Sequence, residues 1–513
     1  MPVIAQAIKL KRSNNMKFEL KKLHIAIIIL GCIFILLSAF HSNIWFDESY
    51  SVAIAKHDFM DIWKITGNDV HPALYYWLIH IVYLIFGNNV MVYRLFSVLA
   101  IIILGILGIT HIKKDFGENT GLLFSFFAYF LPVMCTYSQE VRMYSWSCLI
   151  ITLMSIYAYR LYISVKNNEY SKKNLIIFGI LSIASCYIHY YALVTAGLVN
   201  LLLLIYFIKN IKLNKKPLIH FLILAAIQVV LYIPWLIYFV GQLQHVGGGF
   251  WIVVGPINTT VEVLSFQFRR QLDTNFAFNA HTIYSLVAAI LMYVYIGYRV
   301  FKSKKEQKSI KPAILSGGVY LGVILIMVLI SIFTPILFSR YLMVMTGLYI
   351  FTLAYMISTE NKKWITISIC AITLILGTIS NVTNILINYD ESNMKQIEYM
   401  KENIKNDDII VYSNIGNGGV VAAFFPENKQ YFYNGQHWDV EEAYKAYGPK
   451  METIYDYNEI LKDYTGRIWL IDSEYMGLWD EFPKENITVL KEAQRFDTKY
   501  QNYIYNIMLV EKD

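Results

Sequence analysis

Two adjacent carboxylates, Asp47 and Glu48, follow the first long apolar segment of the sequence. Moving such a group to the centre of a bilayer costs roughly 2.5–3.5 kcal/mol, so ionisable residues beside apolar segments usually mark functional sites. A carboxylate in this setting can accept a proton from a substrate or bind a cation. The alternative is a solvated acidic loop without a function of its own. Aromatic residues before the pair and a helix-like run after it favour the functional interpretation.

Further ionisable residues stand at the ends of later apolar segments. Asp69 and His71 form a polar cluster before a short apolar run. The others are Glu140, Arg142, His189 and Arg340. Arginine and histidine bind anions through charge-assisted hydrogen bonds, and carboxylates serve as bases or metal ligands. Each has a structural alternative, because an arginine can extend toward lipid headgroups and a histidine between tyrosines can anchor a helix at the membrane surface.

The composition is that of a membrane protein. Of the 513 residues, 56% are hydrophobic and 16% are charged, and the mean hydropathy is +0.44. Soluble domains have roughly 45–50% apolar residues. The five cysteines all lie inside apolar runs, without the spacing of a disulfide framework or a zinc site.

Charge is distributed unevenly along the chain. Residues 1–387 hold 31 lysines and arginines against 14 acidic residues, whereas residues 388–513 hold 13 against 23. The basic excess falls in short segments between apolar runs, which is typical of cytoplasmic loops. We therefore attribute it to membrane topology and expect no nucleic-acid partner.

Eleven segments are apolar and long enough to be predicted as transmembrane helices. They are 24–40, 90–112, 120–137, 145–163, 174–190, 192–208, 217–239, 282–301, 312–333, 341–358 and 364–387. The lysine-rich segment 1–23 predicts a cytoplasmic N-terminus and an uncleaved signal-anchor, since no small-residue cleavage site follows the first span. An odd number of spans then places the C-terminus outside a multi-pass protein of the plasma membrane.

The apolar segment 72–87 is predicted to lie at the membrane surface instead of crossing. Its sixteen residues reach about 24 Å as a helix, short of the roughly 30 Å hydrocarbon core. If it crossed, the lysine clusters of the later loops would all lie outside, against the positive-inside rule. With this topology the ionisable candidates fall on the outer face, around the loops 41–89 and 240–281. We expect the chemistry there.

After the last span, residues 388–513 become polar and acidic. The pattern predicts a helix at 390–405 and strands at 408–413, 430–433, 467–472 and 503–510. The predicted fold class is therefore an α-helical polytopic membrane protein with outer-face juxtamembrane helices. It consists of a basic N-terminus (1–23), a transmembrane catalytic domain (24–387) and a small extracytoplasmic α/β domain (388–513).

The order of four short motifs after the Asp-Glu pair resembles that of a known family. The motifs are HPALYYW (71–77), YSQEVRMYSW (137–146), HYYA (189–192) and TPILFSRYLM (334–343). Together they look like the polytopic GT-C glycosyltransferases, in the branch of the protein-O-mannosyltransferases, the lipid A aminoarabinose transferases and the bacterial mannosyltransferase-like proteins. The resemblance covers residues 40–200 most clearly and the last motif less so.

This resemblance implies transfer of a sugar from a polyprenyl-monophosphate donor to a hydroxyl of a glycan, lipid or protein acceptor, on the outer face of the membrane. Asp47 matches the family's catalytic Asp and would be the general base, a role worth typically 10²–10⁴ in rate. Glu48 beside it would orient Asp47 or contact a metal. We predict inversion, because a single carboxylate serves a single displacement.

The resemblance also implies roles for the remaining candidates. The predicted donor-phosphate ligands are His71, Arg142, His189 and Arg340. The predicted substrate-binding residues are Tyr75, Tyr76 and Tyr341, although the first two also fit the aromatic belt at a membrane surface. The aminoarabinose transferases have Glu-Lys where this sequence has Val70-His71. A divalent cation such as Mg²⁺ or Mn²⁺ would therefore take Glu140 and Asp69 as ligands, and the sequence leaves open whether one is required.

Three other functions fit parts of the sequence. A transporter or flippase of a lipid-linked sugar would place charges near mid-bilayer and show paired half-repeats, neither of which is visible. A ligase or polymerase of a lipid-linked glycan would use a similar donor site, and the sequence separates it poorly from a monosaccharide transferase. A wall-binding outer domain on a membrane anchor would not need eleven spans.

Overall fold

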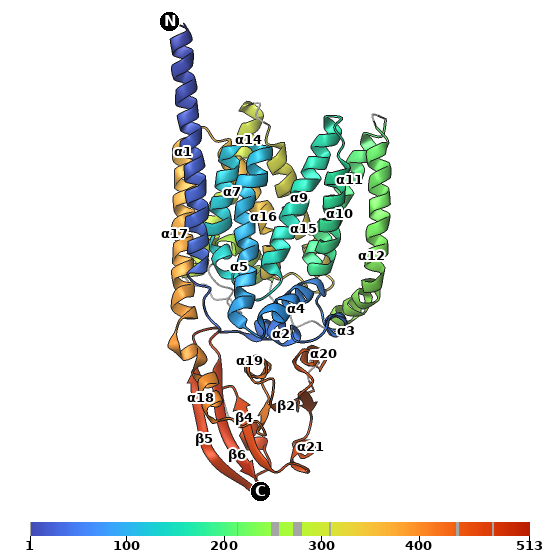
Figure 1. Ribbon diagram of the computed structural model, residues 1–513, viewed down its shortest axis with the longest axis vertical. Helices are drawn as coiled ribbons and strands as arrows, with labels where there is room; N and C mark the ends of the chain where they lie inside the picture. Colours follow the sequence, from blue (N-terminus) through green and yellow to red (C-terminus); the bar gives the residue numbers. More distant parts are fainter. Residues whose placement is uncertain are drawn as a thin grey trace. The chain divides into compact units, whose positions relative to one another are not determined.

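The computed structural model contains two compact units, each made of two stretches of the chain (Figure 1). The structure describes residues 2–212, 214–247, 256–269, 280–306, 309–437, 441–474 and 477–513. The first unit comprises Met1–Leu37 and Ser97–Thr383, and the second comprises Ser38–Phe96 and Asn384–Asp513. The predicted outer loop 41–89 therefore folds with the C-terminal segment.

The first unit is a bundle of helices that run alongside one another (Figure 1). Its helices are α1 (Pro2–Leu36), α5 (Val90–Leu107, of which 90–96 belong to the second unit), the π-helical turn η1 (Gly108–Ile112), α6 (Lys113–Phe116), α7 (Glu118–Phe130), α8 (Pro132–Tyr137), α9 (Tyr144–Lys166), α10 (Lys172–Ile188), α11 (Tyr190–Lys209), α12 (Lys216–Gly247), α13 (Pro256–Ser265), η2 (Phe266–Phe268), α14 (Ala280–Glu306), α15 (Lys311–Ser331), η3 (Ser339–Met345), α16 (Thr346–Ser358) and α17 (Lys363–Asn388, of which 384–388 belong to the second unit). Large apolar side chains remain exposed on it, among them Ile237 at 80%. Such a surface suits lipid, and helices satisfy their own backbone hydrogen bonds there.

Within the described residues, eight helices are long and apolar enough to cross a membrane. They are Val90–Phe116, Tyr144–Lys166, Tyr190–Lys209, Lys216–Val246, Ala280–Glu306, Lys311–Ser331, Ser339–Ser358 and Lys363–Asn388. This confirms a multi-pass integral membrane protein. The other three predicted spans fall in α1, whose side chains are described only from Glu19, in α7 with 13 residues and in α10 with 17. The number eleven stays a prediction.

Helices α9 and α16 are in close contact within the bundle. A Cβ atom added to Gly347 on α16 would lie 1.9 Å from Thr152 Oγ1 on α9. Small residues at such crossings let two helices approach closely where lipid gives no hydrophobic drive for association. The 3₁₀ turn η3, which leads into α16, is held beside the start of α9 for this reason.

The second unit combines three short helices with an α/β domain (Figure 1). The helices are α2 (Phe46–Ile54), α3 (Phe59–Asn68) and α4 (Leu74–Phe86). The domain contains η4 (Glu391–Met394), α18 (Lys395–Asn403), β1 (Ile409–Tyr412), α19 (Ile415–Phe424), β2 (Lys429–Tyr433), α20 (Glu441–Tyr444), η5 (Lys445–Tyr447), β3 (Met451–Ile454), α21 (Asn458–Leu461), β4 (Gly466–Asp472), α22 (Gly477–Glu481), β5 (Ile487–Asp497) and β6 (Ile504–Lys512). Helix α4, at 13 residues, is too short to cross, as its sequence predicted.

The six strands form one mixed sheet in the order β3-β2-β1-β4-β6-β5. Strands β1 to β4 run parallel to one another, and β6 pairs antiparallel with both β4 and β5. In the centre, Val411 lies opposite Leu470, and Leu470 lies opposite Met508. These side chains are buried, as expected for parallel strands covered on both faces.

The predicted α/β domain and its four strands are confirmed to within a few residues. Two strands were missed. Strand β3 has only four residues and includes the charged Glu452, and β5 is a largely exposed edge strand rich in polar residues. Neither has the buried apolar pattern by which a strand is recognised in sequence, so pairing with a neighbour defines both.

Candidate functional site

The two adjacent carboxylates lie in the first turn of α2, which begins at Phe46. Negative charge is stabilised there by the helix dipole and the unpaired N–H groups of the first turn. The surroundings of the two differ, because Asp47 is partly exposed and Glu48 is fully buried. Asp47 is therefore the carboxylate of the pair that a substrate can reach.

Glu48 is held by a buried ion pair within the second unit. Arg94, in the first turns of α5, donates from Nη1 to Glu48 Oε1 at 2.8 Å and from Nη2 to Oε2 at 3.3 Å. Tyr500 Oη donates to Glu48 Oε2 at 2.8 Å. Arg94 is itself fully buried, and its Nη2 also donates to the carbonyl of Asn43. A buried carboxylate requires such partners. Both oxygens of Glu48 thus serve to fix α2.

Sequence reasoning missed Arg94 and Tyr500. Arg94 sits inside the predicted span 90–112, and a charged residue within an apolar segment is itself a signal of function. Tyr500 is one of 40 tyrosines, in a polar stretch of the C-terminal domain. No pattern in the sequence distinguishes it.

Asp69 and His71 form a second pair, in the link between α3 and α4. His71 Nδ1 lies 3.1 Å from Asp69 Oδ2, and the two side chains are 19% and 15% exposed. Burial of Asp69 opposes ionisation, but the hydrogen bond and charge of His71 outweigh it and lower the pKa of Asp69 below its ordinary value. Asp69 is therefore ionised at neutral pH and orients the His71 ring.

The predicted substrate-binding residues Tyr75 and Tyr76 are completely buried in the second unit. The ring centroid of Tyr76 lies 5.5 Å from that of Tyr50 and 6.4 Å from that of His71. The Tyr76 ring therefore packs between the Tyr50 ring and the His71 ring. A role for these two tyrosines in binding substrate stays a prediction.

In the first unit, three chain reversals bring together the other predicted residues. Arg142 lies in the turn before α9, His189 lies between α10 and α11, and Arg340 and Tyr341 lie in η3. Arg142, His189 and Arg340 are all buried. The charges that act on the hydroxyl of Tyr144 come from Arg340, Arg142 and Glu140. These residues therefore surround a common point at the start of α9.

His189 is fixed in both position and tautomer. Its backbone is extended, and its Nδ1 accepts a hydrogen bond from the Tyr191 N–H at 3.0 Å, which caps α11. In the neutral ring the proton is then assigned to Nε2, so that this atom is the donor. The ring centroids of Tyr341 and Tyr144 lie 5.1 Å and 5.8 Å from that of His189.

A further arginine is tied into the same end of the bundle. Arg269 lies 3.5 Å from Glu262 Oε1, and Ser339 Oγ donates to Glu262 Oε2 at 3.0 Å. Glu262 thus links the loop after α13 to the residue before Arg340. With Arg142 included, three arginines stand against Glu140 and Glu262. The cluster carries a positive excess, which suits an anion with several oxygens.

The predicted metal ligands are Glu140 and Asp69. Among the described residues, no group of three or more His, Cys, Asp or Glu side chains is placed to hold a metal ion. Asp69 is engaged by His71, and Glu140 lies among arginines. The residues described do not by themselves form a metal site, and the assignment of Glu140 and Asp69 as ligands stays a prediction.

Parts of the predicted outer loop 240–281 lie outside the described residues. These parts are 248–255 and 270–279, which include Gly248, Gly249 and Arg270.

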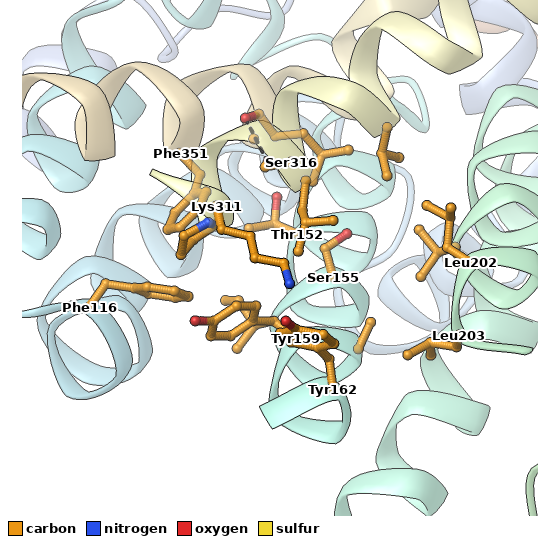
Figure 2. Close-up of a pocket in the computed structure, with 18 of the residues that line it drawn as sticks. Phe116, Thr152, Ser155, Tyr159, Tyr162, Leu202, Leu203, Lys311, Ser316 and Phe351 are labelled. Atoms are coloured by element: carbon orange, nitrogen blue, oxygen red, sulfur yellow. Dashed lines mark hydrogen bonds between the residues drawn. The ribbon is translucent and has the colours of Figure 1, made fainter. Parts of the chain in front are cut away.

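A cavity of about 300 Å³ opens in the first unit between α9, α11, α15 and α16 (Figure 2). Its walls are mainly apolar, and the Lys311 side chain extends into it with Nζ 4.9 Å from the centre of the Tyr162 ring. On α9 the lining begins at Thr152, eight residues or about 12 Å of helix beyond Tyr144. The cavity and the arginine cluster thus share two helices and lie at successive levels of the bundle.

Comparisons with known proteins bear on the class of this protein. Residues 70–238 match the family described as dolichyl-phosphate-mannose-protein mannosyltransferase. No curated protein matches the chain.

Two solved structures share its fold almost from end to end. ArnT from Cupriavidus metallidurans in the apo state matches with a TM-score of 0.57 and 8% identity, over 96% of this chain and 98% of that one. ArnT from the same organism bound to undecaprenyl phosphate matches with a TM-score of 0.56 and 10% identity, over 94% and 97%. The chain therefore has the fold of ArnT, and its residues 70–238 are similar to the dolichyl-phosphate-mannose-protein mannosyltransferases.

Proposed function

We propose that this protein transfers a sugar from a polyprenyl-monophosphate donor to an acceptor hydroxyl, with inversion at the anomeric carbon. The observation that carries the proposal is the buried cluster of Arg142, Arg340 and His189 at one end of a membrane-spanning bundle. Arginine and histidine side chains gathered at one place bind the oxygens of an anion through charge-assisted hydrogen bonds. The family match and the fold shared with an ArnT structure that contains undecaprenyl phosphate support a lipid phosphate as that anion.

The reaction follows from the chemistry of these groups. The Asp47 carboxylate accepts the proton of the acceptor hydroxyl, and the oxygen attacks the anomeric carbon of the sugar. The bond from that carbon to the phosphate oxygen breaks, and its electron pair leaves with the polyprenyl phosphate. The arginines stabilise the negative charge that accumulates on this oxygen. His189 Nε2–H is a further donor to it.

Replacement of Asp47 by Asn tests the base. The change keeps the shape of the side chain and removes the proton acceptor, so we expect transfer by the purified protein to fall by about 10²-fold or more. Donor binding should be retained. The measurement is turnover with a synthetic polyprenyl-phosphate sugar.

Asp61→Asn is the matched control, because Asp61 is an exposed carboxylate in the first turn of α3. It should behave as wild type. Near-normal turnover of Asp47→Asn would remove Asp47 as the base. A wild-type protein that moves the donor across a bilayer without breaking the sugar–phosphate bond would favour the transporter alternative instead.

Arg142 and Arg340 are predicted to bind the donor phosphate. Arg142→Gln and Arg340→Gln should each weaken donor binding by about tenfold or more, because a charge-assisted hydrogen bond contributes roughly 1.5–3 kcal/mol. Lysine should restore binding only in part, since a point charge does not reproduce the guanidinium fork. Binding is measured by titration with polyprenyl phosphate.

Arg160→Gln is the control for charge removal. Arg160 Nε donates to Asp115 Oδ2 at 2.7 Å, so its guanidinium already has a carboxylate partner of its own. This variant should bind donor as wild type does. Unchanged donor affinity in both Arg142→Gln and Arg340→Gln would show that these arginines serve only the structure.

The apolar cavity is proposed to hold part of the polyprenyl chain of the donor. It lies farther along α9 and α11, the helices whose first residues stand beside the arginine cluster. A lipid whose phosphate lies in the arginine cluster would place its chain along these helices, where burial contributes about 25 cal/mol per Å² of apolar surface.

A tryptophan at Leu202, which lines the cavity on α11, tests this placement. Leu202→Trp should raise KM for a long-chain donor by about tenfold, a loss of roughly 1.4 kcal/mol, and leave KM for a short-chain donor unchanged. The control is Leu201→Trp, because Leu201 does not line the cavity and is 51% exposed. Equal KM values for both donors in Leu202→Trp would place the chain elsewhere.

The lysine distribution supports a cytoplasmic N-terminus and an extracytoplasmic C-terminal domain. Cysteine introduced at the exposed Glu427 should then react with an impermeant thiol reagent on intact cells. Cysteine at the exposed Lys305, at the end of α14, should react only after permeabilisation. The five native cysteines give the background in wild type. Labelling of Lys305→Cys on intact cells would reverse the proposed orientation.

A further inference from the structure

The residues on either side of Asp47 are both bound by one turn of the C-terminal domain. This turn, residues 498–503, joins β5 to β6. Tyr503 Oη accepts a hydrogen bond from the Phe46 N–H at 3.3 Å, and Tyr500 Oη donates to Glu48 Oε2 at 2.8 Å. All of these residues belong to the second unit. The proposed base thus lies between two residues that the same turn holds.

Tyr503 provides a hydrogen-bond acceptor at the start of α2, where the chain has no side-chain cap of its own. The residue before the helix is Trp45, whose side chain makes no capping hydrogen bond. The first N–H groups of a helix have no partner within the helix, and a buried one without a partner is costly. Tyr503 accepts the hydrogen bond of the first of these groups and so defines where α2 begins.

The turn itself is firmly held. The Thr498 N–H donates to the Tyr503 carbonyl at 2.8 Å, and the Tyr503 N–H donates to Thr498 Oγ1 at 3.1 Å. The Tyr500 N–H donates to Asn393 Oδ1 at 2.7 Å. Lys499 forms an ion pair with Asp390. With its backbone bonded on both sides, the turn presents its tyrosine hydroxyls at defined positions.

Helix α19 contacts α2 on its other side. A Cβ atom added to Gly419 would lie 2.9 Å from the Phe46 ring and 3.0 Å from Ser49 Oγ, so only glycine permits this approach. Ser49 Oγ also forms a hydrogen bond of 2.8 Å with Tyr447 Oη. The α2 helix is therefore enclosed by α19, by η5 and by the turn 498–503.

Helix α19 begins at the position where open parallel sheets usually bind ligands. It follows β1, and the strand order reverses between β1 and β4. Open parallel sheets bind their ligands at such a reversal, beyond the carboxyl ends of the strands. Here α2 packs against the helix that starts there. The domain uses the part of its sheet that elsewhere binds small molecules to hold a segment of its own chain.

We propose that the C-terminal domain is the scaffold of the catalytic helix, and that Tyr500 and Tyr503 are positioning residues for Asp47. Neither tyrosine takes part in the reaction. Tyr500 acts through Glu48, and Tyr503 acts through the first turn of α2. The inference rests on the proposed function, in which Asp47 is the general base.

The test removes the two hydroxyl groups and keeps the rings. Displacement of a catalytic group by about an ångström can lower the rate by on the order of 10²-fold. We expect the double variant Tyr500→Phe/Tyr503→Phe to lower kcat by about tenfold or more and to leave KM for the donor within about twofold. The Arg94–Glu48 pair remains, so the thermal unfolding temperature in detergent should change little.

Tyr464→Phe is the matched control within the same domain. Its hydroxyl also donates hydrogen bonds, to the carbonyls of Asp407 and Arg467, each at 3.0 Å. This variant should have wild-type kcat. A kcat within about twofold of wild type in the double variant, or an equal loss in Tyr464→Phe, would overturn the inference.

A second measurement does not need activity. Asp47→Cys should react with a thiol reagent at a rate that the double tyrosine variant changes by about threefold or more, while Tyr464→Phe leaves it unchanged. If wild type shows no sugar transfer but this rate does change, the proposed function fails and the positioning of residue 47 stands. An identical labelling rate in all three backgrounds would overturn the positioning role.

Discussion

The buried ion pair between Glu48 and Arg94 is the interaction on which the candidate site depends most. Both groups are buried away from water. Removing one partner of a buried ion pair leaves the other charge unpaired and costs about 3–5 kcal/mol. Their two hydrogen bonds and the Tyr500 hydroxyl hold the first turn of α2 in one position. Asp47, the adjacent residue in the chain, is held in place by this pairing. One carboxylate of the adjacent pair is buried in an ion pair, and the other is partly exposed and is the proposed base.

The basic cluster in the first unit obeys a different constraint. Arginines in a low-dielectric setting need partners, and Glu262 serves as one for Arg269. The guanidinium carbon of Arg340 lies 4.7 Å from the centre of the Phe338 ring, a cation–π contact that offsets part of the lost hydration. The positive excess that remains is what the phosphate of the proposed donor would neutralise. Binding of the donor and stability of the empty site therefore oppose each other, which is common where an enzyme holds a charged substrate.

The α/β domain of the second unit contacts the helix that carries Asp47. Its sheet contacts the segment that carries Asp47 through a glycine on α19 and through the turn 498–503. The rigid part of the domain lies in the central strands, where Val411, Leu470 and Met508 are buried. The proposed base on α2 needs such support, since a helix of nine residues is not stable by itself. Packing against the domain therefore provides the stability that so short a helix lacks by itself.

The sequence by itself determined the membrane class of the protein, the α/β class of the C-terminal domain and the pair Asp47 and Glu48 as the centre of interest. Apolar length, positive loops and period-two strands are local signals, and local signals can be read directly. The different roles predicted for the two carboxylates came from the family resemblance, and the residue pattern did not show that Glu48 is buried in an ion pair, because neighbours in sequence have the same local pattern. Glu48 is buried because of Arg94, 46 residues away, and Tyr500, 452 residues away. Contacts over such separations arise from packing of the whole unit, and only the tertiary structure decided them.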